Sequence, residues 1–159
     1  MISIIAAIGK NRELGKNNKL LWHIKEDMIR FKNLTTNQVV IMGRKTYESL
    51  PYKFKPLPNR INIVVTRKSN ESHEIYWVNS IEDAIEKAKE FNKEIFIIGG
   101  AQIYNLGIKY CDKLYLTLVD KEYLDADVFF PGYSDFKKVV SEENYSSENL
   151  QFKFIELVK

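Results

Sequence analysis

The chain has 159 residues and a net charge of +3 at neutral pH, with 45% hydrophobic and 28% charged side chains. These values are typical of a globular domain with one core, and the mild charge excludes a nucleic-acid-binding protein that relies on a dense basic surface. The single cysteine, Cys111, excludes an internal disulfide, and with only two histidines the chain cannot form an ordinary structural zinc site. We therefore expect no metal, no nucleic-acid partner, and Cys111 as a small core residue of a protein in the reducing cytoplasm.

In chain order, the hydrophobic pattern predicts an alternation of strands and helices. We expect a buried strand at 1–8, a polar loop at 9–19, a helix at 26–34, a strand at 39–42 and a short helix at 45–50. Next we expect a proline-rich loop, a strand at 61–65, an exposed polar stretch at 66–74 and a strand at 75–78. Ser80 is expected to cap a helix that runs to about Phe91, with Asp83 at its third position, followed by a strand at 95–98, a helix from Ala101 and a strand at 113–119. The opening apolar run is too short to span a membrane and no basic segment precedes it, so we expect neither a signal peptide nor a membrane partner.

The alternation stops after Asp120. Two further strands are expected at 136–141 and 150–158, joined by a polar turn near 146–149, and we expect Phe129 and Phe130 to point inward from a loop. Repeated strand–helix–strand order implies right-handed crossovers and a mainly parallel sheet. The sequence therefore predicts an α/β, single-domain, three-layer fold over residues 1–159. Its central, mostly parallel sheet should have about eight strands and an antiparallel C-terminal hairpin at one edge.

Two predicted strands end at glycine where a helix is expected to begin. Gly43 follows the strand at 39–42 and precedes Arg44 and Lys45, and the pair Gly99 and Gly100 follows the strand at 95–98. A strand end that leads into a helix N-terminus presents free backbone N–H groups, which suit phosphate. Because open α/β sheets bind ligands at the carboxyl ends of their strands, these two sites together indicate a phosphate-rich cofactor.

One carboxylate lies on the apolar side of the helix expected at 26–34. Asp27 falls within the stripe formed by Ile24, Met28, Phe31, Leu34 and Thr35. It could interact with backbone N–H groups at the start of the helix, which is the common role of such an aspartate. Alternatively it could face a ligand pocket and bind a cationic or amidine-like group, in which case desolvation would raise its pKa and allow proton transfer.

The sequence offers little other side-chain chemistry. No second paired acid, metal-spaced cluster or Ser-His-Asp arrangement is supported by spacing. A mechanism would therefore depend on a cofactor, with or without one acid, and hydride transfer fits this because the cofactor carries the reactive atom.

Eight segments, in this order and spacing, resemble the dihydrofolate reductase family from Met1 to Lys159. They are MISIIAAI, residues 22–27, VVIMGRKTYESLP, PLPNR, VVTR, IIGGAQIY, KLYLTLVD and the closing hairpin. The resemblance implies a dihydrofolate-reductase-like fold and NADPH-dependent reduction of 7,8-dihydrofolate to tetrahydrofolate, by hydride transfer to pterin C6 with protonation of N5. It also implies a role in one-carbon metabolism and in thymidylate and purine synthesis, binding of antifolate inhibitors, and a monomer.

On the substrate side, the resemblance gives Asp27 the role of binding the pterin ring, with Thr117 supporting its carboxylate through hydrogen bonds. Trp22 would order a water, and the proton would arrive through water near Leu20 and Trp22. Arg60 would pair with the α-carboxylate of the glutamate tail, a task suited to its planar fork. The positions implied to line the pterin and benzoyl pocket are Ile5, Ala6, Met28, Phe31, Ser49, Leu50, Leu57 and Ile98.

On the cofactor side, the resemblance implies four groups of contacts. The nicotinamide contacts are Ala7, Leu14, Gly15, Asn18 and Ile98. The first phosphate site comprises Gly43, Arg44, Lys45 and Thr46, and the second comprises Gly99, Gly100, Ala101, Gln102, Ile103 and Tyr104, with a cis peptide between the two glycines. Val65, Thr66 and Arg67 lie at the adenosine 2′-phosphate, where Arg67 and Arg44 favour NADPH over NADH by charge and bidentate hydrogen bonding.

Two departures from the family pattern affect loops. Leu21 stands where the family commonly has proline before the tryptophan, so the loop 9–22 should have more freedom, which bears on loop closure and inhibitor affinity. Asn59 stands where glycine is frequent, and asparagine tolerates the left-handed conformation.

Other interpretations of the same residues stay open at this point. Arg44, Lys45 and Arg67 could be solvated surface charges, Thr117 an outward strand residue, and the apolar pocket positions plain core. A pyrimidine reductase of riboflavin synthesis shares a similar fold and NADPH site but needs neither Asp27 nor Arg60 in these positions. A folate- or nucleotide-binding protein without turnover is the alternative from another class.

Overall fold

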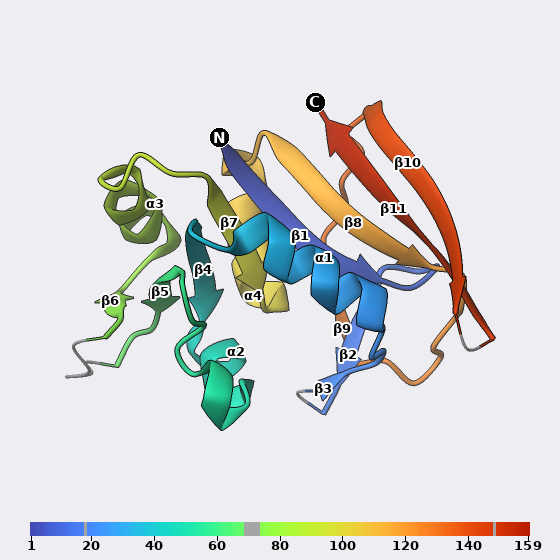
Figure 1. Ribbon diagram of the computed structural model, residues 1–159, viewed down its shortest axis with the longest axis horizontal. Helices are drawn as coiled ribbons and strands as arrows, with labels where there is room; N and C mark the ends of the chain where they lie inside the picture. Colours follow the sequence, from blue (N-terminus) through green and yellow to red (C-terminus); the bar gives the residue numbers. More distant parts are fainter. Residues whose placement is uncertain (18, 69–73, 148) are drawn as a thin grey trace.

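The computed structural model describes residues 1–17, 19–68, 74–147 and 149–159. Eight of its strands form one sheet in the order β10-β11-β8-β1-β7-β4-β5-β6 (Figure 1). These strands are β1 (Ile2–Ile8), β4 (Val39–Gly43), β5 (Ile61–Val65), β6 (Tyr76–Val78), β7 (Ile95–Gly99), β8 (Lys113–Val119), β10 (Lys138–Ser147) and β11 (Leu150–Val158). The strands from β8 to β6 are parallel, and β11 and β10 are added antiparallel at one edge. The predicted sheet is confirmed.

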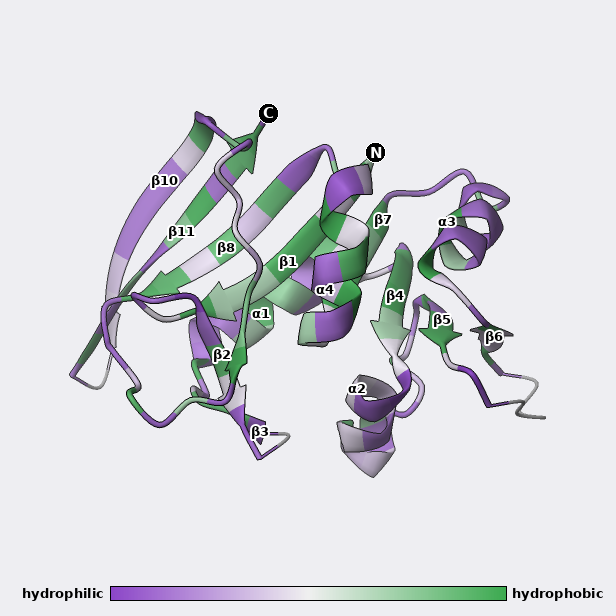
Figure 2. Cartoon of the chain, turned by 180° about the vertical axis from the view of Figure 1, so that it is seen from behind, coloured by the Kyte–Doolittle hydropathy of each residue, from purple (hydrophilic) through white to green (hydrophobic). Residues whose placement is uncertain are grey.

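Helices cover both faces of this sheet. The helices are α1 (Lys25–Thr35), α2 (Arg44–Ser49), α3 (Ile81–Lys89) and α4 (Ala101–Gly107), with short 3-10 turns at Tyr52–Phe54 and Ile108–Tyr110. Figure 1 shows α1 in front of the sheet, and Figure 2, from behind, shows α4 on the opposite face. The Ser80 hydroxyl accepts a hydrogen bond from the Asp83 N–H, which confirms the predicted cap of α3.

The core is divided between the two faces of the sheet. A larger cluster joins β1, β7 and β8 to α3 and α4, and a smaller one, which includes Val40, Met42 and Phe96, packs against α1 and α2. Figure 2 shows hydrophobic residues concentrated in the central strands, whereas the edge strand β10 is mainly hydrophilic. Cys111 is buried as expected, and this burial raises the pKa of its thiol to about 12, so the thiol is inert at neutral pH.

The largest error of the sequence prediction lies in the polar loop at 9–19. Residues of this loop form β2 (Glu13–Lys16) and β3 (Lys19–Leu20), which join β9 (Val128–Phe129) in a second, antiparallel sheet. These strands have only two to four residues each, too few for a period-2 pattern, and β9, the partner of β2, lies more than 100 residues away in the sequence. Of the two adjacent phenylalanines, Phe130 is buried as expected but Phe129 is 44% exposed in β9.

Smaller errors concern boundaries. The strand predicted at 136–141 begins two residues later, at Lys138, and continues to Ser147, because its polar second half pairs throughout with β11. Thr66, the residue after β5, was expected to be exposed but is buried, because its N–H donates to Val78 O at the end of β6. The rest of the expected polar stretch is described only for residues 67–68 and 74.

Candidate functional site

The carboxylate of Asp27 faces the sheet at the carboxyl end of β8. Thr117, a buried residue of that strand, donates a hydrogen bond of 2.5 Å from its hydroxyl to Asp27 Oδ1. Asp27 lies in the first turn of α1, whose N-cap residue Ile24 makes no side-chain cap. Among the described residues, Thr117 is the hydrogen-bond donor to this carboxylate, and no backbone N–H of α1 donates to it. The geometry favours a ligand-facing acid over a helix cap.

The surroundings of Asp27 favour its protonated form. Burial raises the pKa of the carboxyl, and the Thr117 hydrogen bond and the positive charge of Arg30 only partly offset that rise. An acid that is buried, held by one hydroxyl and raised in pKa suits both hydrogen bonding to a ligand and a part in proton transfer.

A second charged group lies beside the same helix, at the turn before β5. The Arg60 guanidinium donates to Thr35 Oγ1 at 3.2 Å and to Pro58 O at 2.9 Å, and it lies 5.8 Å from the centre of the Phe31 ring. Asn59 has a φ of 59°, in agreement with the expected left-handed conformation. Arg60 therefore forms, with Phe31, one end of an aromatic and cationic surface along α1.

Asn62 fixes this turn, and the sequence analysis missed it. Its buried side chain accepts from Leu57 N–H and donates to Leu57 O, both at 3.0 Å, and donates to Arg60 O at 3.1 Å. The signal was a polar residue between two apolar residues, Ile61 and Ile63, of a buried strand. Such a residue is buried only where its hydrogen bonds are satisfied.

The apolar positions expected at the substrate differ in exposure. Ile5, Ala6 and Leu57 are buried, Phe31, Leu50 and Ile98 are partly buried around the smaller core cluster, and Ser49 is exposed at the end of α2. Met28, which lies on the predicted apolar stripe of α1, is 47% exposed. Leu20, at the end of β3, is 76% exposed.

The two glycine-terminated strands lie side by side, as predicted. Met42 of β4 pairs with Gly99 of β7, and the peptide between Gly99 and Gly100 is cis, as the resemblance implies. A Cβ on Gly100 would come within 3.2 Å of Thr46 Oγ1 in α2, and Gly99 has a φ of 133° that favours glycine. Glycine at these two positions thus lets the end of β7 pack closely against Thr46 of α2.

The cationic residues near these strand ends differ in their pairing. Lys45 and Arg67 are exposed, while Arg44 is partly buried and its Nη1 lies 2.9 Å from Glu48 Oε1. Tyr104 is buried, and its hydroxyl lies 2.9 Å from Ile5 O and 2.8 Å from Ile98 O, so it holds β1 and β7 together. Of the remaining predicted positions, Gly43 ends β4, and Val65 and Thr66 lie at the end of β5. The first turn of α4 contains Ala101, Gln102 and Ile103. This set of exposed cations, hydroxyls and glycines fits a phosphate-bearing cofactor.

A loop region closes the site on the side of β2. Leu14 and Gly15 lie buried in β2, Ala7 is partly buried at the end of β1, and Asn18 lies outside the described residues. The Trp22 ring meets Tyr123 edge-on at 5.2 Å between centroids, and its indole N–H is buried without an acceptor among the described residues. An unpartnered N–H at this position suits hydrogen bonding to a water or a ligand atom.

Glu13 is a further buried carboxylate that the sequence analysis passed over. Its Oε1 accepts from Asn11 N–H at 2.5 Å and its Oε2 from Tyr123 N–H at 2.6 Å. Glu13 therefore joins the segment before β2 to the segment before β9. It sits in a run that looks like a solvated loop, so its burial left no signal in the sequence.

Comparison with known proteins gives one consistent family. The family described as Dihydrofolate reductase matches residues 1–159. The dihydrofolate reductase of Buchnera aphidicola subsp. Acyrthosiphon pisum is 47% identical over 132 residues, which cover 83% of this chain and 80% of that protein. The dihydrofolate reductase of Haemophilus influenzae is 42% identical, over 81% of this chain and 78% of that protein. The dihydrofolate reductase of Bacillus subtilis is 41% identical, over 93% of this chain and 87% of that protein. In the described part of the chain, no helix is both long enough and apolar enough to cross a membrane.

Proposed function

The chain belongs to the dihydrofolate reductase family, and from this premise we propose how its residues divide the work. The protein reduces dihydrofolate to tetrahydrofolate with NADPH as cofactor, and this membership decides against the riboflavin-pathway reductase and the binding protein without turnover. When bound, NADPH supplies the hydride that we place at C6 of the pterin. The observation that carries the assignment of the pterin site is the buried Asp27 carboxylate held by Thr117.

Asp27 binds the pterin and prepares N5 for its proton. A carboxylate pairs well with adjacent N–H groups such as the ring amide and 2-amino group of a pterin. Its negative charge raises the basicity of N5 nearby, which favours protonation of that atom. The proton reaches N5 through water on the side of Leu20 and Trp22, where the free indole N–H offers a hydrogen bond.

The remaining predicted residues hold the two molecules in place. Arg60, with Phe31 beside it, binds the α-carboxylate of the glutamate tail while the apolar positions enclose the pterin and benzoyl rings. The strand-end glycines with Arg44, Lys45 and Thr46 bind one phosphate group of NADPH, and Arg67 with Thr66 binds the 2′-phosphate. Asn18, which lies outside the described residues, stays a proposed nicotinamide contact. We further propose one domain over residues 1–159 that acts as a monomer in the cytoplasm, binds antifolate inhibitors, and has neither nucleic acid nor membrane as a partner.

The experiment that tests this division of work is Asp27→Asn, assayed by the loss of NADPH absorbance on addition of dihydrofolate. Asparagine keeps the shape but removes the charge and the titration. The loss of one general acid–base contribution predicts a turnover reduced by about 10²–10⁴-fold, with the largest deficit at high pH, where N5 is unprotonated.

The comparison variant is Glu122→Gln, which removes an exposed carboxylate elsewhere and should turn over as the unaltered protein does. If Asp27→Asn kept its rate across the whole pH range, the role given to Asp27 would be wrong.

A further inference from the structure

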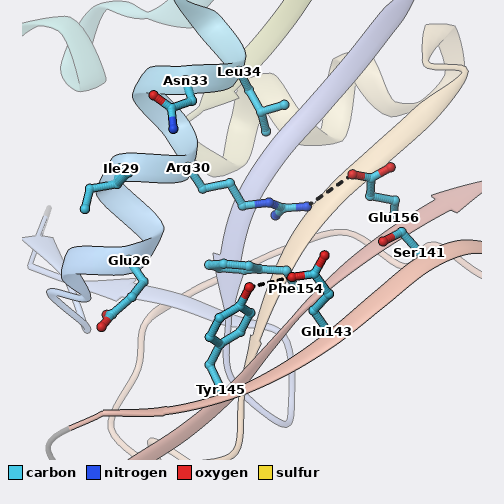
Figure 3. A pocket seen from close by; sticks show the side chains of 10 residues that line it. All are labelled: Glu26, Ile29, Arg30, Asn33, Leu34, Ser141, Glu143, Tyr145, Phe154 and Glu156. Atoms are coloured by element: carbon cyan, nitrogen blue, oxygen red, sulfur yellow. Dashed lines mark hydrogen bonds and ion pairs between the residues drawn. The ribbon is translucent and has the colours of Figure 1, made fainter.

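Arg30 lies on α1 one turn after Asp27 and reaches under the helix toward the antiparallel hairpin. Figure 3 shows its side chain extending above Phe154 of β11 to the carboxylate of Glu156. The guanidinium carbon lies 4.5 Å from the centre of the Phe154 ring and 5.6 Å from that of Tyr115, and only 14% of the side chain is exposed. This arginine forms one wall of a cavity of about 410 Å³ between α1 and the hairpin.

Stability alone does not account for a cation in this place. Arg30 Nη2 lies 3.7 Å from Glu156 Oε1, longer than a hydrogen bond, and Nη1 is buried with no acceptor among the described residues. Glu156 is already paired with Lys113 at 2.7 Å. A buried ion pair of such geometry recovers little of its desolvation cost, and an apolar side chain would often serve as well.

Arg30 and Asp27 both belong to α1 and are three residues apart. Residues three apart on a helix are neighbours, with about 5–6 Å between their Cβ atoms. Burial lowers the pKa of Arg30 and the surrounding acids raise it, Glu156 most and Asp27 next, but the guanidinium stays charged at any working pH. Conversely, the positive charge of Arg30 opposes the rise that burial imposes on the pKa of Asp27.

The other charged and titratable groups facing this pair are few. On β11 and β10 they are Glu156, Glu143 and Tyr145, of which the last two are hydrogen-bonded to each other. On β8 they are Lys113 and Tyr115, with Thr117 at Asp27 itself, and on α4 the Tyr104 hydroxyl lies in the field of Asp27. On α1, Glu26 lines the same cavity. Among them, Glu156 is the acid that most directly balances Arg30.

We propose that Arg30 is a positioning residue for the reaction: its positive charge under α1 favours the ionised form of the Asp27 carboxylate, and Glu156 moderates that effect. The inference rests on the role of Asp27 given under the proposed function. It implies opposite effects of the two partners. Without the charge of Arg30, Asp27 should hold its proton to higher pH, and without the charge of Glu156 it should release the proton at lower pH.

The test compares Arg30→Met, Arg30→Lys and Glu156→Gln with the unaltered protein. Methionine keeps the apolar stem against Phe154, lysine keeps the charge, and glutamine keeps the hydrogen bonding of Glu156 to Lys113. Two readings are taken: the titration of the Asp27 carboxyl by carbon NMR, assigned by its absence in Asp27→Asn, and the single-turnover rate of NADPH oxidation against pH. A control, Lys89→Met, removes an exposed cation from α3.

We expect Arg30→Met to move both midpoints up by about 0.5 pH unit, equal to a roughly 3-fold change in the ratio of protonated to ionised Asp27. Glu156→Gln should move both midpoints down, and Arg30→Lys and Lys89→Met should leave them in place. Equal midpoints in all variants, or a shift of the same sign in Arg30→Met, Arg30→Lys and Glu156→Gln, would overturn the inference.

The outcomes also separate this inference from the proposed function. If Asp27→Asn retains a normal pH–rate profile, the role of Asp27 fails whatever Arg30 does. If Asp27→Asn changes the pH–rate profile while the NMR midpoint of Asp27 is the same in Arg30→Met, Glu156→Gln and the unaltered protein, only the inference about Arg30 fails. Should Arg30→Met not fold, Glu156→Gln decides alone. Because the pKa of Asp27 is raised in the folded state, a loss of structure would also lower the midpoint, so the circular dichroism spectrum of Glu156→Gln must match that of the unaltered protein before its shift is counted.

Discussion

The Asp27 carboxylate is held in a position that costs the folded protein stability. Its pKa is raised chiefly by burial, despite the hydrogen bond from Thr117 and the charge of Arg30. Since the folded pKa lies above the unfolded one, the ionised form is less favourable in the folded state. The cost is fully present above the folded pKa and disappears as pH falls below the unfolded value of about 4.

Asp27→Asn should therefore unfold at a higher temperature than the unaltered protein at neutral pH, even though it is expected to lose turnover. The gain is expected because asparagine has no charge to bury, whereas the Asp27 carboxyl must ionise in the folded protein at neutral pH. Thermal unfolding followed by circular dichroism at neutral and at acid pH checks this, because the gain should vanish at acid pH. A lower unfolding temperature at neutral pH would mean that Asp27 stabilises the fold.

The pKa of Glu13 is shifted in the opposite direction to that of Asp27, and its carboxylate joins the segment at β2 to the segment before β9. Burial raises the pKa of this carboxyl, but hydrogen bonds from the backbone N–H groups of Tyr123, Glu13 and Asn11 together outweigh that effect and lower it. Because the folded pKa is lowered, the stabilisation is present above the unfolded value and is lost as pH falls through the folded one. The carboxylate thus supports the sheet of β2, β3 and β9 at neutral pH.

Glu13→Gln should destabilise this part of the molecule by about 1–3 kcal/mol at neutral pH, because an amide NH₂ would face a backbone N–H that now donates to Oε1 or Oε2. Denaturant unfolding and hydrogen exchange at the Tyr123 N–H measure the loss, which should shrink as pH falls. Glu122→Gln, at an exposed neighbouring position, is the matched control and should change neither. Unchanged exchange at Tyr123 in Glu13→Gln would show that the carboxylate does not join these segments.

Elements whose signals are local in the sequence were predicted, and those that depend on distant partners were not. The main sheet followed from apolar strands with glycine at their carboxyl ends, and α3 from its period and Ser80 cap, because these signals are local. The sheet of β2, β3 and β9 did not, since its strands are short and Glu13 binds an N–H that lies 110 residues away. Arg30 was missed for the same reason, because its partner on β11 becomes a neighbour only after folding. Asn62 differs, since its partners Leu57 and Arg60 are close in sequence and its place between two apolar residues was a local signal.

Over the whole molecule, the two core clusters bring the ends of β4 and β7 together, and the proposed cofactor site spans that junction. A ligand that binds only the folded state stabilises it by an amount set by its concentration relative to its Kd, about 2.7 kcal/mol at 100 times Kd. Binding can therefore be measured without turnover, by thermal unfolding in the presence of NADPH alone.

NADPH at that concentration should raise the unfolding temperature by roughly 5–10 °C, and NADH at the same concentration by much less, because only NADPH carries the 2′-phosphate. The exposed Arg67 is the residue proposed to bind that phosphate, so Arg67→Gln should bring the NADPH shift down toward the NADH shift. It should leave the NADH shift itself unchanged, which separates loss of phosphate binding from damage to the fold. Lys89→Met again serves as the control for removing an exposed cation. Equal shifts with NADPH and NADH in the unaltered protein would contradict the placement of the 2′-phosphate at the end of β5, where Val65, Thr66 and Arg67 lie.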